Sequence, residues 1–231
     1  MKAFFIYFSL FATLLTTSQR LFAQTSIPYV EPTAEFSNSE KTDEQTDAMS
    51  GSAPITGTFA INPTVPGGWT EYYEWRFTHE NETTPYLIRY EQETSLTFTD
   101  YGTHKIGYYA LFTQGTDSIV YTADSISCSV SQSKLEMPNA FSPNGDNVND
   151  IYKAKDGYQS IIDFHATIFN RWGQKIYEWS NPAEGWDGTF HGTPVKEGVY
   201  YVLVKATGSD GKKYVIKRDV NLLRGFREYD D

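Results

Sequence analysis

The sequence predicts an all-β protein in which two tandem immunoglobulin-like β-sandwiches follow a signal peptide and a flexible acidic spacer. Short runs of alternating apolar and polar residues recur from Pro54 onwards, as in antiparallel strands with one buried face. Beyond residue 23, no segment has the i, i+3, i+4, i+7 apolar spacing of an amphipathic helix. We therefore expect strands in both domains.

Residues 1–23 have the order of charged and apolar residues that is typical of a secretory signal peptide. Lys2 precedes an apolar run from Phe4 to Leu15, and Ala23 offers a small residue for cleavage. The apolar run is shorter than the ~20 residues that a membrane-spanning helix needs. We expect Sec export, cleavage after Ala23 and no transmembrane anchor in the mature chain.

The chain is acidic, with 19 Lys and Arg residues against 29 Asp and Glu residues and a formal charge of −10. Cleavage would remove Lys2, Arg20 and no acidic residue, which changes the charge to −12. Nucleic-acid backbones are bound by clustered basic residues, so we expect no nucleic-acid partner.

Residues 24–53 are rich in acids and poor in apolar residues, which predicts a flexible spacer. A surface loop of the following domain is the alternative.

Residues 54–132 are predicted to form the first sandwich. Tyr73, Trp75 and Phe77 alternate with polar residues, as expected for a strand with one buried face. The segment Trp75-Arg76-Phe77, with the later Gly102–Tyr108 segment, resembles PKD-type immunoglobulin-like domains, although the glycine-aspartate loop of that family is missing.

Cys128 is the only cysteine, so no intramolecular disulfide can form. It alternates with serines in step with Ile126 and Val130. We therefore expect a buried thiol without catalytic function, because a reactive thiolate requires exposure and positive neighbours.

Residues 134–231 are predicted to form the second sandwich. The turn from Gly208 to Gly211 has the composition of a hairpin connection. The expected strands contain Phe164, Ala166 and Ile168, then residues 174–179, 200–206 and 214–223.

Four ordered motifs in this second unit indicate a specific family. They are MPNAFSPNGDNVND at 137–150, IFNRWG at 168–173, GWDGT at 185–189 and EGVYY at 197–201. Together they resemble the gliding motility-associated C-terminal domain, which is the type B sorting domain of the type IX secretion system. The residues that carry this resemblance are Phe141, Pro143, Asn144, Gly145, Asp146, Asn149, Asp150, Asn170, Arg171, Trp172, Gly173, Trp186, Asp187, Gly188, Gly198 and Tyr200.

The resemblance implies passage through the type IX translocon, with an outer-membrane sorting partner, to the cell surface or the medium. The motif residues also have structural explanations. Asn144, Gly145 and Asp146 favour a tight turn capped by side-chain oxygens, Trp186 is expected to plug the core edge, and Gly198 is expected to start a strand. Each motif residue can therefore serve the fold, the sorting signal, or both.

The first motif also offers several oxygen ligands to a calcium ion. The candidate ligands are Asn144, Asp146, Asn147, Asn149 and Asp150. The glutamate that closes an EF-hand loop is absent, so only weak binding of about 10⁻⁴ to 10⁻³ M is expected. A loop that closes on its own side chains without metal is the alternative.

The sequence predicts no enzymatic activity. It contains no Gly-x-Ser-x-Gly elbow and no phosphate-binding loop, and the segment that starts at His79-Glu80 lacks the second histidine of a zinc protease motif. A small hydrolase therefore ranks below two other classes. These are an exported protein with a sorting domain and a carbohydrate-binding or adhesive module that would bind a surface glycan through Trp69, Tyr72, Tyr73, Trp75 and Tyr86.

Overall fold

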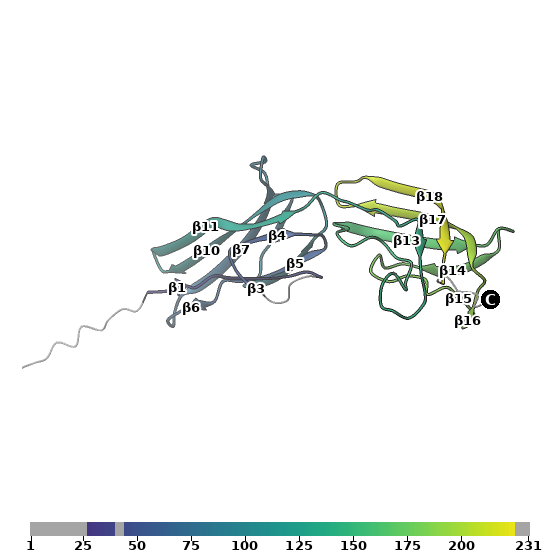
Figure 1. Ribbon diagram of the computed structural model, residues 1–231. Coiled ribbons are helices and arrows are strands. Elements are labelled where there is room, and N and C mark those ends of the chain that lie inside the picture. Colours follow the sequence, from purple (N-terminus) through teal and green to yellow (C-terminus); the bar gives the residue numbers. More distant parts are fainter. Residues whose placement is uncertain (1–26, 40–43, 225–231) are drawn as a thin grey trace, which may run out of the picture.

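The computed structural model describes residues 27–39 and 44–224, and every regular element in these ranges is a β-strand. The strands form two domains joined end to end (Figure 1). The predicted all-β class is confirmed. The predicted signal peptide lies outside the described residues.

The first domain is a sandwich of two sheets with a small two-stranded ribbon beside them. One sheet has the order β4-β11-β10-β7-β8, and its strands are β4 (Ala48–Gly51), β11 (Asp117–Val130), β10 (Gly102–Gln114), β7 (Thr70–His79) and β8 (Leu87–Arg89). The other has the order β3-β2-β5-β9, and its strands are β3 (Glu44–Gln45), β2 (Thr33–Ser37), β5 (Ile55–Ala60) and β9 (Glu93–Phe98). The ribbon pairs β1 (Tyr29–Val30) with β6 (Pro63–Thr64).

Aromatic side chains from both sheets fill the space between them. The ring of Phe59 on β5 lies 5.7 Å from the rings of Trp75 and Phe77 on β7, measured between centroids. All three side chains are fully buried, and Cys128 lies in the same core. The prediction of a buried thiol is confirmed, and burial raises the pKa of Cys128 to about 12.

The expectation of a flexible spacer over residues 24–53 is wrong for the described part of that segment. Strand β2 pairs with β5, and β4 adds in parallel to the edge of β11. Ala34, Phe36 and Met49 are buried in the first core. These apolar residues supply enough buried surface to order the segment in spite of its acids, so the first domain begins well before residue 54.

The second domain contains one five-stranded sheet with the order β12-β18-β17-β13-β14. A short hairpin and long loops form the layer that packs on one face of this sheet. The sheet strands are β12 (Ala140–Phe141), β18 (Lys213–Leu222), β17 (Gly198–Gly208), β13 (Ile161–Phe169) and β14 (Lys175–Trp179), and the hairpin strands are β15 (Thr189–Phe190) and β16 (Thr193–Pro194).

Serine hydroxyls join the two domains. Ser160 lies in the second domain, and its hydroxyl accepts the backbone N–H of Ala53 at 3.1 Å and lies 2.8 Å from the hydroxyl of Ser131. The hydroxyl of Ser209 donates to the carbonyl of Ser131 at 2.9 Å, and the N–H of Tyr101 donates to the carbonyl of Ser209 at 3.0 Å. These bonds connect the end of β11 with the start of β13 and the β17–β18 turn.

Candidate functional site

The first motif folds into a loop that is held by one carboxylate. Asp150 accepts the backbone N–H groups of Asn144 at 2.9 Å, Gly145 at 2.8 Å and Asn147 at 2.8 Å. The hydrogen bond from Gly145, together with those from Asn147 and Asn144, lowers the pKa of Asp150 against the opposing effect of burial. Gly145 has a φ of 84°, a backbone conformation that glycine adopts without strain.

The oxygens predicted as calcium ligands are acceptors for the loop itself. Asp146 accepts the N–H of Val148 at 2.8 Å and the side-chain amide of Asn144 at 2.9 Å. Together with the three donors to Asp150, these bonds direct N–H groups at the carboxylates that a cation would need. Across residues 27–39 and 44–224, no three His, Cys, Asp or Glu side chains gather as a metal site. The side chains of Asn144, Asp146 and Asp150 close the loop through its own N–H groups, whereas Asn147 and Asn149 have positive φ values of 66° and 53°. Weak calcium binding stays a prediction.

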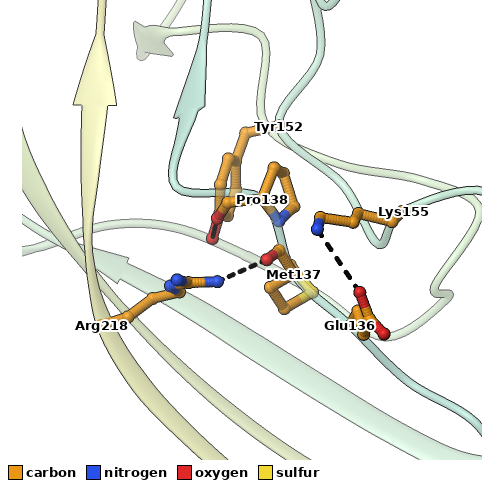
Figure 2. A network of polar contacts seen from close by, with 6 residues as sticks. All are labelled: Glu136, Met137, Pro138, Tyr152, Lys155 and Arg218. Carbon is orange, nitrogen blue, oxygen red and sulfur yellow. Dashed lines mark hydrogen bonds and ion pairs between the residues drawn. The ribbon is translucent and has the colours of Figure 1, made fainter.

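A polar network attaches the chain just before this loop to the sheet. Figure 2 shows Arg218 of β18 donating to the carbonyl of Met137, while the hydroxyl of Tyr152 donates to the carbonyl of Pro138 at 2.9 Å. Neither Tyr152 nor Arg218 lies in the motifs that the sequence singles out. Two backbone carbonyls of the first motif are thereby satisfied by side chains, which fixes the entry of the chain into the domain.

Three of the four motifs meet in the core of the second domain. The ring of Trp186 lies 5.3 Å from that of Phe141 and 5.0 Å from that of Tyr200. Trp186 is fully buried, and its indole N–H donates to the carbonyl of Thr189 at 2.7 Å. As predicted, it is a core residue, and Gly198 begins strand β17.

The turn after Trp186 explains the next two motif residues. Asp187 accepts both the N–H and the hydroxyl of Thr189, at 2.9 and 2.8 Å. Gly188 has a φ of 78°, and a side-chain Cβ there would lie 3.0 Å from the ring of Pro143. The glycine therefore permits both the turn and the close approach of the first motif.

The remaining motif forms the β13–β14 turn and behaves differently. Asn170 accepts the N–H groups of Trp172 and Gln174, each at 3.0 Å. The guanidinium of Arg171 lies 4.2 Å from the ring centroid of Trp172. Trp172 is 74% exposed, so the turn of this motif is displayed on the surface, whereas Ile168 at its start is buried in the core.

The aromatic residues that were predicted to bind glycans do not form a common surface. Trp75 is fully buried, Trp69 and Tyr73 pack against the core, and Tyr86 turns its ring toward His79 at a centroid distance of 4.7 Å. Of the predicted set, Tyr72 and Tyr86 are exposed, and Tyr72 lies on the outer face of the first sheet.

Two tyrosines that the sequence reading missed flank Tyr72. Its ring lies 6.1 Å from that of Tyr90 and 6.2 Å from that of Tyr109. Tyr109 lies on the outer face of β10, and Tyr90 directly follows the end of β8, so no shared sequence pattern indicates the pair.

The two histidines of the first domain, His79 and His104, pack against other rings. The rings of His79 and His104 lie 5.0 Å apart although they are distant in sequence. His104 is buried against Phe98, its Nδ1 lies 2.9 Å from the hydroxyl of Tyr86, and burial lowers its pKa. The pair fills space between strands.

Comparison with protein families finds a match to the CHU_C type IX secretion signal domain over residues 135–217. This range contains all four motifs. Comparison with curated proteins found no match. Among the described residues, no helix is long and apolar enough to cross a membrane. The resemblance of the first domain to PKD-type domains stays a prediction. The C-terminal domain of this chain is a type IX secretion signal domain of the CHU_C family.

Proposed function

We propose that residues 134–231 direct this protein across the outer membrane through the type IX secretion system. A type IX signal domain implies interaction with that system and export to the cell surface or the extracellular space. The proposal adds a Sec-dependent first step through residues 1–23 and an outer-membrane sorting partner. The observation that carries it is the family match over a segment whose motifs fold into one domain.

A fusion experiment tests this function. Residues 134–231 are attached to a fluorescent protein that is exported to the periplasm of a host with an intact type IX translocon. We expect the fusion to reach the cell surface or the medium, and to stay in the periplasm of the same host without the translocon. Retention in both hosts would contradict the proposal.

For the first domain we propose a binding function without enzymatic activity, with a neutral surface glycan as the ligand class. Tyr72, Tyr90 and Tyr109 form an aromatic surface, and polar groups lie within it. The hydroxyl of Tyr72 donates to Glu74 at 2.8 Å, and Arg76 is paired with the same carboxylate. Rigid, amphipathic tyrosine rings give contact area at a small entropic cost, and the Glu74–Arg76 pair balances its own charge.

The protonation states of Glu74 and Tyr72 favour hydrogen bonds to the hydroxyl groups of a glycan. Burial opposes ionisation of Glu74, but hydrogen bonds from Arg76 and Tyr72 lower its pKa. The hydrogen bond to Glu74 raises the pKa of Tyr72 to about 12, so the phenol keeps its proton at neutral pH. A glycan array with wild-type protein and with Tyr90→Ala tests the assignment. Tyr101→Ala, also exposed and in the first domain, is the control that should bind like wild type.

A further inference from the structure

The outer face of the second sheet carries apolar side chains that the core does not explain. Along β17, Val202 and Val204 point into the core, so the alternate residues Tyr201 and Leu203 point to the opposite face. Tyr201 is 47% exposed. The layer of loops and the β15–β16 hairpin packs on the other face, which leaves this one open.

Cross-strand neighbours assemble these side chains into a hollow. Tyr201 stands opposite Phe169 of β13 on one side and Asp219 of β18 on the other, and Leu203 stands opposite Lys217. The side chains line an open, mainly apolar depression of about 400 Å³. Charges of both signs lie on its β18 side.

The displayed turn adjoins this hollow. Phe169 ends β13, and Arg171 and Trp172 follow directly in the turn. The other two tryptophans of the domain, Trp179 and Trp186, are buried. Neither Arg171 nor Lys217 makes an ion pair with any residue that the structure describes. Tryptophan, tyrosine and arginine are the residue types that dominate binding energy at protein interfaces.

The position of this surface suits a signal that is attached to a larger cargo. Strand β13 leaves the joint with the first domain beside Ser160 and ends at Phe169 (Figure 1). At about 3.3 Å per residue, the length of β13 places Phe169 roughly 26 Å from its start. The first domain therefore leaves the hollow and the turn accessible.

We infer that the secretion machinery binds the distal face formed by Phe169, Arg171, Trp172, Tyr201 and Leu203. This inference rests on the proposed function, which states that a protein of the type IX system must recognise the domain. The matching partner is a folded protein surface. It places an apolar side chain in the hollow and carboxylates opposite Arg171 and Lys217.

Substitutions on the distal face in the full chain test the inference. Trp172→Ala and Tyr201→Ser are expressed in a host with an intact translocon, and the surface-exposed fraction is measured by protease accessibility in whole cells. Loss of an interface hot spot weakens binding by about 30-fold, so we expect surface delivery to fall by roughly tenfold or more, with accumulation in the periplasm and an unchanged melting temperature. Tyr101→Ser makes the same chemical change at an exposed site of the first domain and should be delivered like wild type.

The outcomes separate this inference from the proposed function. Failure of the wild-type chain to reach the surface would remove the proposed function itself. Delivery of wild type and of both variants at equal levels would overturn the distal face alone. If Tyr201→Ser lowers the melting temperature, Arg171→Glu decides, because Arg171 is exposed and the substitution only reverses a charge. Normal delivery of that variant would also overturn the inference.

Discussion

The indole N–H of Trp186 donates to the carbonyl of Thr189 at 2.7 Å, and the ring fills the core between Phe141 and Tyr200. One side chain thereby connects the first, third and fourth motifs. The signal and the core of the domain share these residues, so loss of the core should also remove the signal.

Trp186→Ala should abolish export by unfolding the second domain. Truncation of a buried tryptophan costs about 3 to 5 kcal/mol, which is a large part of the roughly 5 to 15 kcal/mol that stabilises a typical domain. Calorimetry of the full chain should show the transition of the second domain at a lower temperature or missing.

The matched control is Trp172→Ala, which removes the same atoms from an exposed site and should leave the calorimetric transitions unchanged. A Trp186→Ala protein that melts like wild type and still fails to leave the periplasm would identify Trp186 as a contact residue instead.

Asp150 should make the stability of the second domain dependent on pH. Its pKa in the folded domain is lowered by the N–H groups of Gly145, Asn147 and Asn144. A carboxylate whose pKa is lower in the folded than in the unfolded protein stabilises the fold at pH values above its unfolded pKa of about 4. This stabilisation is lost as the pH falls through the folded pKa.

The melting temperature of Asp150→Asn should therefore lie below that of wild type at neutral pH, and the gap should narrow below a pH of about 4. Asn170→Ala removes an uncharged acceptor of backbone N–H groups in another turn of the domain, so its deficit should be similar at both pH values. A gap for Asp150→Asn that does not change with pH would contradict the assigned cause.

Calcium should stabilise the protein only slightly. The carboxylates of Asp146 and Asp150 already accept N–H donors of the loop. An ion at ten times its Kd adds only about 1.4 kcal/mol. Melting curves with millimolar calcium and with a chelator should nearly coincide. A shift of many degrees that disappears in Asp146→Ala would establish a tight structural site.

Periodicity in the sequence predicts most of the fold correctly. The alternation at Phe164, Ala166 and Ile168 identifies a strand with one face in the core, and the structure buries all three. Residues 24–53 were misread because acid density outweighed the short alternation of Ala34 and Phe36. Two buried residues in a short strand give a weak signal, and parallel pairing of β4 with β11 across about 80 positions has no local signature.

The sequence predicts those parts of the candidate site that a motif fixes as a turn. It does not predict the parts that depend on which strands pair and in which register. Asn144, Asp146 and Asp150 close a loop through neighbours in sequence, which the residue types indicate. The distal face depends on Tyr201 standing opposite Phe169, a register that only the assembled sheet defines. The tyrosines around Tyr72 were missed for the same reason.

Ser160 should be the residue on which the joint between the domains depends most. It is almost fully buried, and its hydroxyl is the acceptor for the N–H of Ala53. In Ser160→Ala that N–H loses its partner, and a buried donor without an acceptor costs about 1 to 3 kcal/mol. We expect the calorimetric unfolding transition at the lowest temperature to shift to a lower temperature and the amide of Ala53 to exchange hydrogen faster.

The control is Ser131→Ala, which removes the hydroxyl that bonds to Ser160 but leaves the acceptor of Ala53 in place. Its effect should be nearer the ~0.5 to 1.5 kcal/mol of a single hydrogen bond. Equal losses in the two variants would show that the joint depends on the serine pair as a whole, and no loss in Ser160→Ala would show that water replaces the hydroxyl as acceptor.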